Sequence, residues 1–165
     1  MANWHGKLLL AMFAALATVH GGARADAPYA PDFALRATDG NNYRLSEYRG
    51  EVVALVFWAS WCGGCRRELE RLQQLSDIYR DAGLRVIAVS VDEKPEAAQS
   101  IAASAGVTYP VLLDKGKAVA ASYDPPDLPA TWLIDRSGRL RFAQRGAEPR
   151  TDRELLAELR ALLDE

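Results

Sequence analysis

The chain has 165 residues, of which 49% are hydrophobic, and its formal net charge is −2. This length and composition suffice for one globular domain with a hydrophobic core. So small a net charge does not indicate the excess of positive charge that binds nucleic acid or an anionic membrane surface, and we expect neither as a partner.

Residues 1–25 are typical of a signal peptide. Lys7 supplies a positive start, residues 8–19 an apolar stretch, and Ala23-Arg24-Ala25 a cleavage motif. The apolar stretch is shorter than the ~20 residues of a membrane-spanning helix, so we expect no stable membrane insertion after cleavage. Cleavage after about Ala25 removes two basic residues and no acid, which changes the net charge from −2 to −4. We therefore expect an exported, periplasmic protein with a single domain over residues 26–165.

Strand and helix patterns alternate along this domain. Phe33-Ala34-Leu35 and Tyr43-Arg44-Leu45 flank the turn sequence Asp39-Gly40-Asn41 and predict a hairpin. Ser46 is expected to cap a single helical turn that reaches Tyr48. Later strands are expected over 52–58, 84–91, 111–113, 131–134 and 140–144, with helices over 95–105 and 118–123 and a last one after Thr151. This order predicts an α/β fold in which helices flank a central mixed sheet.

The strand over 52–58 is an unbroken apolar run, which indicates burial on both faces. The helical periodicity that follows predicts an amphipathic helix to about Ala82, with Gly83 as its stop. Its apolar positions are Leu69, Leu72, Leu75 and Ile78. A final helix is predicted where Thr151 and Glu154 form a capping box, and its apolar face comprises Leu155, Leu156, Leu159, Leu162 and Leu163.

Both cysteines lie between the central strand and the helix after it, in Trp61-Cys62-Gly63-Gly64-Cys65. The first turn of a helix has unpaired N–H groups and partial positive charge, which stabilise a thiolate. Two intervening residues let the sulfur atoms meet, so that each can displace the other from a mixed disulfide. This pattern favours thiol–disulfide exchange.

Two other interpretations of the cysteines are a buried structural pair and a zinc half-site. A disulfide across a loop of two residues provides little chain-entropy stabilisation, which argues against a purely structural bond. A zinc site would need two more ligands, and the histidines of the chain, His5 and His20, both lie in the expected signal peptide.

Three stretches carry a resemblance to a known family. Residues 52–68, VVALVFWASWCGGCRRE, resemble the active-site stretch of thioredoxin-fold proteins, within them the exported TlpA/ResA-like thiol-disulfide oxidoreductases. Residues 124–135, DPPDLPATWLID, resemble the cis-proline loop of that family, with Pro129 as the cis-proline. Residues 31–50 resemble its N-terminal hairpin extension. The resemblance therefore implies a thioredoxin fold with an N-terminal β-hairpin.

The resemblance also implies roles for individual residues. Cys62 would be the exposed attacking thiol and Cys65 the resolving one, with Pro129 facing them. The backbone beside Pro129, at Leu128 and Ala130, would pair with a substrate segment in the manner of a strand.

Trp61 is expected to form an apolar rim around Cys62 for a protein substrate, while Trp58 packs in the core. Glu68 matches an acid that several ResA-like proteins place beside the dithiol. A partly buried Glu68 would accept the proton of the resolving thiol or tune its pKa, and the alternative is a solvated acid near the helix start.

The chain departs from the family pattern at two positions. Gly64 stands before the second cysteine, where proline is common, so a redox potential does not transfer. Ala130 follows the cis-proline, where the cytochrome c-biogenesis thioredoxins have an acid.

The expected function is reduction of protein disulfides by an exported oxidoreductase, in cytochrome c maturation or periplasmic thiol homeostasis. The partners are protein thiols and disulfides, with a membrane thiol-electron transporter as donor. No cofactor is expected beyond the redox-active Cys62–Cys65 disulfide.

Three alternative functions remain. A peroxiredoxin-like thiol peroxidase usually has Thr or Ser three residues before its reactive cysteine, a position that Ala59 occupies here. A Cu(I)-binding thiol carrier would use both thiolates, although further soft ligands are scarce in the mature chain. A non-catalytic binding domain is the third.

Overall fold

The computed structural model describes residues 27–145 and 149–165 of the chain. The expected signal peptide, residues 1–25, lies outside the described residues. Within the described part, no helix combines the length and the apolar composition that crossing a membrane requires.

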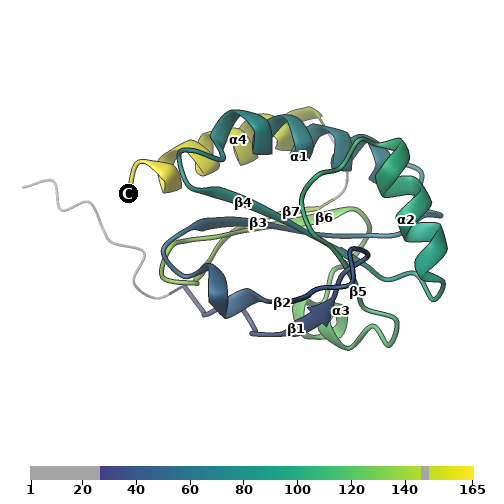
Figure 1. Cartoon of the computed structure of the whole chain (residues 1–165). Helices are drawn as coiled ribbons and strands as arrows, with labels where there is room; N and C mark the ends of the chain where they lie inside the picture. Colours follow the sequence, from purple (N-terminus) through teal and green to yellow (C-terminus); the bar gives the residue numbers. More distant parts are fainter. Residues whose placement is uncertain (1–26, 146–148) are drawn as a thin grey trace, which may run out of the picture.

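A five-stranded sheet forms the centre of the molecule (Figure 1). Its strands, in spatial order, are β5 (Val111–Leu113), β4 (Leu84–Ser90), β3 (Val52–Trp58), β6 (Ala130–Ile134) and β7 (Leu140–Arg145). β4 is parallel to both β3 and β5, whereas β6 is antiparallel to β3 and to β7. The mixed sheet expected from the order of the elements is confirmed.

Two layers cover this sheet (Figure 1). On one face lie α1 (Cys65–Tyr79), α2 (Pro95–Ser104) and α4 (Pro149–Leu163), whose apolar residues join one core cluster. On the other face lie the hairpin of β1 (Ala34–Arg36) and β2 (Asn42–Arg44), the 3₁₀ turn η1 (Leu45–Tyr48) and α3 (Ala118–Tyr123). The predicted N-terminal hairpin is thus present as a separate two-stranded sheet.

β3 lies between these layers, and each of its seven residues is at most 2% exposed. Because side chains alternate along a strand, Val56 and Trp58 pack toward α1 while Leu55 and Phe57 pack toward α3. The Phe57 ring centroid lies 5.4 Å from that of Trp132 in β6. The continuous apolar run is therefore explained by burial on both faces, which fixes the position of the strand end that carries the dithiol.

The helix after the dithiol differs from its prediction at two points. α1 ends at Tyr79 rather than near Ala82, and Gly83 takes its positive φ of 100° in the turn that follows. Ile78 is 67% exposed, although its spacing suggested the buried face. Successive steps of three residues drift backwards around a helix of about 100° per residue, so Ile78 lies opposite Leu69. Ser76 takes the buried position instead.

Two predicted caps are wrong. Ser46 lies inside η1 rather than before it, and its backbone N–H donates to Asp32 Oδ1 over 2.9 Å. The Asp32 carboxylate thus accepts the hydrogen bond from a backbone N–H at the start of η1. The local sequence had predicted that the side chain of Ser46 would cap this turn. α4 begins at Pro149, so Thr151 is its third residue and not its cap. Proline is well suited to a first helical turn because it has no N–H to satisfy.

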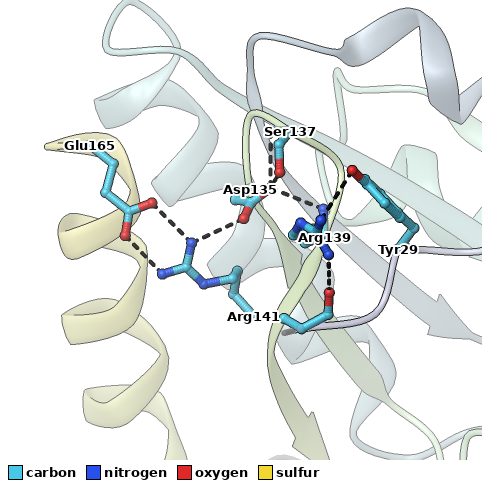
Figure 2. Close-up of polar contacts among 7 residues, drawn as sticks. Tyr29, Asp135, Ser137, Arg139, Arg141 and Glu165 are labelled. Carbon is cyan, nitrogen blue, oxygen red and sulfur yellow. Dashed lines mark hydrogen bonds and ion pairs between the residues drawn. The ribbon is translucent and has the colours of Figure 1, made fainter. Parts of the chain in front are cut away.

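The edge of the sheet opposite the dithiol is held by the turn between β6 and β7. Ile134 pairs with Val53, at the start of β3, so this turn lies far from the end of β3 at Trp58. Figure 2 shows Arg139 reaching the N-terminal segment, where its guanidinium lies 4.1 Å from the centroid of the Tyr29 ring. In the same view Arg141 bridges Asp135 and Glu165 near the C-terminus.

Candidate active site

The dithiol occupies the short connection between β3 and α1. β3 ends at Trp58, and the Cys62 backbone N–H donates to the Ala59 carbonyl over 3.2 Å, which closes a turn. The N–H of Cys65, the first residue of α1, donates to the Cys62 carbonyl over 3.2 Å. Cys62 and Cys65 form a disulfide, with their Cα atoms 5.4 Å apart. The pair therefore lies at the N-terminal end of α1, where the helix dipole favours negative charge.

The two cysteines differ in accessibility. Cys62 is partly exposed, whereas Cys65 is 0% exposed and belongs to the core cluster that contains Leu69 and Trp58. A partner from solvent can approach the sulfur of Cys62 and not that of Cys65. This asymmetry is what a two-step exchange needs, because one sulfur must meet the partner while the other stays within reach of the first.

A groove of about 640 Å³ opens beside Cys62. Trp61, which is 70% exposed, and the proline-rich loop before β6 both line it. The residues that line the groove are Trp61, Cys62, Gly63, Gly64, Val91, Lys117, Ala120, Pro125, Pro126, Asp127 and Leu128. An exposed aromatic ring beside a reachable sulfur provides a contact surface for another polypeptide.

The residues around Pro129 occupy different environments. The Leu128–Pro129 peptide bond is cis, Leu128 lines the groove, and Pro129 is buried. Ala130 is 0% exposed, because it begins β6 and pairs with Phe57 in β3. The side chain of Ala130 is therefore buried in the sheet, and the backbone pairing expected at Leu128 and Ala130 stays a prediction.

Glu68 is 3% exposed, so the solvated alternative for this residue is wrong. Its carboxylate accepts bonds from Arg71 Nη2 over 2.5 Å and Nε over 3.0 Å, and from Thr131 Oγ1 over 2.8 Å. Arg71 Nε also lies 3.5 Å from Asp152 Oδ1, which connects this pair to α4. A buried carboxylate needs such partners, and Arg71 and Thr131 provide them.

Tyr109 lies close to the same carboxylate but has a structural role. Burial, with a smaller contribution from the charge of Glu68, raises the pKa of Tyr109 well above its ordinary value. Its hydroxyl donates to the Leu69 carbonyl of α1 over 3.0 Å. Tyr109 therefore stays protonated at neutral pH and acts as a hydrogen-bond donor to the helix.

Asp92 is a second buried carboxylate near the dithiol, 4% exposed, and sequence reasoning missed it. It accepts bonds from the Ser60 backbone N–H over 2.9 Å, from Ser60 Oγ over 2.7 Å and from Ser90 Oγ over 2.8 Å. The available signal was an acid directly after the strand 84–91, since parallel β3 and β4 end at the same sheet edge. Arg71 and Thr131 were missed as well, and their partner Glu68 gave no local indication of them.

Across residues 27–145 and 149–165, no group of three or more His, Cys, Asp or Glu side chains is placed to hold a metal ion.

Comparison with known proteins places this geometry in a family. The model of the AhpC/TSA family matches residues 28–143. The thiol-disulfide oxidoreductase ResA of Geobacillus kaustophilus is 37% identical over 125 residues, which cover 76% of this chain and 72% of that protein. ResA of Bacillus subtilis is 35% identical over 111 residues, which cover 67% and 62%.

Solved structures agree with these relatives. A crystal structure described as a thiol:disulfide interchange protein DsbE, from Chlorobium tepidum, has a TM-score of 0.79 and 34% identity, covering 83% of this chain and 96% of that one. A solution structure described as a protein disulfide isomerase, from Bacteroides thetaiotaomicron, has a TM-score of 0.78 and 34% identity, covering 84% and 90%. The chain therefore belongs to the AhpC/TSA family and is a ResA-like thiol-disulfide oxidoreductase of the thioredoxin superfamily.

Proposed function

We propose that this oxidoreductase is exported and reduces disulfides in other proteins through Cys62 and Cys65. The Cys62 thiolate attacks one sulfur of the partner's disulfide, and the other partner sulfur leaves as a thiolate. Cys65 then attacks Cys62, the Cys62–Cys65 disulfide forms, and the remaining partner sulfur leaves. Two electrons pass from the dithiol to the partner, and the reverse sequence would oxidise a partner.

The observation that carries this proposal is the difference in exposure between the two cysteines. Cys62 is partly exposed and lines the groove, while Cys65 is buried behind it. This difference supports Cys62 as the sulfur that forms the first bond and Cys65 as the sulfur of the release step. The dithiol carries the electrons, and the proposal includes no further cofactor.

The groove is the proposed docking surface for the partner. Trp61 provides an exposed ring and Leu128 an apolar side chain, and both line the groove. A partner segment would lie extended between them and pair with the backbone on either side of Pro129. In this arrangement Ala130 contributes backbone and no side-chain contact, because its side chain is fully buried.

Glu68 is the proposed proton acceptor for Cys65. It lies one helical turn after Cys65, and both residues are buried. Arg71 compensates its charge, and Thr131 holds its orientation through a 2.8 Å hydrogen bond. Loss of the Cys65 proton creates the thiolate that the release step requires.

Export, cleavage after about Ala25 and a membrane thiol-electron transporter as donor complete the proposal. Their support is the pattern of residues 1–25 and the resemblance to exported reductases. The proposed role is either cytochrome c maturation or general thiol homeostasis in the periplasm. A redox titration against glutathione tests the direction: a reductase has a dithiol more reducing than the glutathione couple, and a more oxidising dithiol would contradict it.

The central experiment uses Cys65→Ser, which removes the release step. We expect this variant to accumulate covalent mixed disulfides with a protein substrate such as insulin, seen as bands that disappear on reduction. The Cys62→Ser/Cys65→Ser double variant is the matched control and should capture nothing. Equal capture by the single and double variants would contradict exchange through Cys62. Peroxide consumption by the reduced protein, measured in parallel, separates a reductase from the peroxidase alternative.

A further inference from the structure

The turn that carries Cys62 is held by a group outside the dithiol and outside the groove contacts of the proposed function. The backbone hydrogen bond from Cys62 to Ala59 closes the turn. Ser60, inside the turn, makes two bonds to Asp92, one from its backbone N–H over 2.9 Å and one from its hydroxyl over 2.7 Å. Ser60 and Asp92 are 32 positions apart, so the tertiary fold brings them together.

Asp92 is itself fixed at the end of β4. Ser90 Oγ donates to Asp92 Oδ2 over 2.8 Å, and the Asp92 backbone N–H donates to Ser90 Oγ over 3.1 Å. The N–H of Val91 donates to the Trp58 carbonyl over 3.0 Å, which holds β4 against the last residue of β3. The carboxylate therefore connects the Cys62 turn to the rigid edge of the sheet.

The donors to this carboxylate are neutral groups. Ser60 provides an amide and a hydroxyl, and Ser90 provides a hydroxyl. By contrast, the carboxylate of Glu68 is paired with the guanidinium of Arg71. The direct hydrogen bonds of the Asp92 side chain thus come from neutral donors alone, and its partner Ser60 lies two residues before Cys62.

We propose that Asp92 is a positioning residue for thiol–disulfide exchange: through Ser60 it fixes the turn that presents Cys62, and it brings a carboxylate close to that turn. A fixed turn keeps the Cys62 sulfur aimed into the groove, which favours attack on a partner disulfide. A nearby negative charge opposes formation of the Cys62 thiolate, which makes the thiol bind its proton more tightly. The inference rests on Cys62 being the attacking thiol, as the proposed function holds.

Other charged side chains share this end of the molecule and remain unchanged in the variants below. Some line the groove, and others line a neighbouring hollow that Trp61 and Ala97 of α2 also line. These side chains are Glu93, Lys94, Lys117 and Asp127. Arg66 on α1 is paired with Glu70 over 2.9 Å. A difference between variant and wild type therefore reports on Asp92 or Ser60.

The chain contains a matched control at the opposite sheet edge. Asp135 is 8% exposed and accepts bonds from the Ser137 backbone N–H over 2.9 Å and from Ser137 Oγ over 2.7 Å, the same pair of donors that Asp92 has in Ser60 (Figure 2). Asp135→Asn and Ser137→Ala therefore change the same serine contacts in a turn far from the dithiol, where Asp135 also bonds the Arg139 N–H and pairs with Arg141. They report a general effect of disturbing such a turn without changing the surroundings of Cys62.

The first measurement is the pH profile of alkylation of the reduced protein by iodoacetamide, an uncharged reagent. We expect the midpoint for Asp92→Asn to lie at lower pH than for wild type, because the opposing charge is gone while the shape is retained. The midpoint for Asp135→Asn should equal that of wild type. An Asp92→Asn midpoint that coincides with both would overturn the proposal.

The second measurement is the rate at which the reduced protein reacts with 2,2′-dithiodipyridine, a small neutral disulfide. We expect Ser60→Ala to react about tenfold more slowly than wild type, because the turn loses its side-chain bond to Asp92. Ser60→Thr keeps the hydroxyl and should restore the rate, and Ser137→Ala should react like wild type. A Ser60→Ala rate equal to that of Ser137→Ala overturns the proposal.

Mass spectrometry of the wild-type protein after brief alkylation tests the underlying assignment separately. Label on Cys62 supports the assignment on which the proposal rests. Label on Cys65 would overturn the proposed function and the inference together, whereas label on Cys62 with unchanged variants overturns the inference alone.

Discussion

Trp58 and Trp61 are close in sequence but occupy opposite surroundings. Trp58 is 0% exposed in the core at the end of β3, whereas Trp61 is 70% exposed beside the groove. The strand β3 ends at Trp58, so the residues after it are no longer enclosed between the two layers, and the side chain of Trp61 reaches solvent. Trp58 therefore contributes to stability, and Trp61 is available to a partner.

Replacing Trp61 with alanine should weaken docking and leave the fold intact. We expect the KM for insulin to rise about tenfold, because an exposed aromatic anchor is lost. The free energy of unfolding should change by less than ~0.5 kcal/mol. Steady-state insulin reduction and urea unfolding provide the two values, with 2,2′-dithiodipyridine as a substrate too small to need the anchor. An unchanged KM for insulin would argue against the groove as the docking surface.

Glu68 shows how burial changes the meaning of a residue near a helix start. Its carboxylate is closed off by Arg71 on its own helix and by Thr131 on β6. Removing one partner of a buried ion pair leaves the other charge uncompensated, which costs more than the pair contributes. The residue therefore matters for stability whether or not it moves a proton.

Glu68→Gln tests both roles. We expect the free energy of unfolding to fall by about 3 kcal/mol, because Arg71 loses its main partner. If Glu68 also accepts the Cys65 proton, release of the mixed disulfide at pH 7 should slow by at least about tenfold. Adding Arg71→Met should recover part of the stability and none of the release rate. A release rate equal to wild type would leave Glu68 with a structural role alone.

At the scale of elements, the turn between β6 and β7 joins both ends of the described chain to the sheet. Asp135 accepts bonds from Ser137 and from the Arg139 backbone, and it pairs with Arg141 over 3.0 Å. Burial raises the pKa of Asp135, but these hydrogen bonds and the Arg141 charge outweigh it, so the net pKa lies below its ordinary 3.8. A carboxylate with a lowered pKa stabilises the folded state at neutral pH and loses that contribution as the pH falls.

Asp135→Asn should therefore destabilise the protein in a pH-dependent way. Above the ordinary pKa of 3.8 the contribution is complete, and we expect a loss of about 2 kcal/mol from weakened charged hydrogen bonds. As the pH falls below 3.8 and then through the lower pKa of the folded state, Asp135 becomes protonated in wild type too, so the two proteins should converge. Urea unfolding across this range measures the difference, with the exposed Asp81→Asn as a surface control. A difference in the free energy of unfolding that stayed constant down to acid pH would contradict this prediction.

At the scale of the whole molecule, three helices cover the face of the sheet that contains the buried side of the dithiol. Leu155, Leu159 and Leu162 of α4 are each at most 1% exposed and share a cluster with Cys65 and Leu69 of α1. The C-terminal helix therefore helps to hold the layer that places Cys65. This helix is far from the dithiol in sequence. The strands before it, β6 and β7, join the same sheet as β3, which leads into the dithiol.

Leu159→Ala measures this packing. We expect a loss of about 2–5 kcal/mol in the free energy of unfolding, because a fully buried leucine leaves a cavity. Ile78→Ala is the control, since Ile78 is apolar and helical but 67% exposed, and it should change stability by less than ~0.5 kcal/mol. Equal losses for the two variants would contradict the burial of α4 against the sheet.

Much of this architecture follows from local patterns. The apolar run 52–58, the dithiol after it and the order of strands and helices were readable because periodicity, turn residues and strand length are local properties. Ile78 and the two caps were misassigned because short-range spacing does not settle which helix face meets a neighbour, or which distant side chain satisfies a helix start. Asp32, from another segment, supplies that partner for η1.

The sequence by itself determined where the dithiol lies, since both cysteines, separated by two residues, directly follow the apolar strand run over 52–58, a pattern that favours thiol exchange. The tertiary structure alone decided the surroundings of each sulfur. Thr131 reaches Glu68 across 63 positions, and Ser60 reaches Asp92 across 32, through pairings of β3 with β6 and of β3 with β4. Contacts of this kind depend on which elements pack together, a collective result of burying the whole core that no single stretch of sequence encodes.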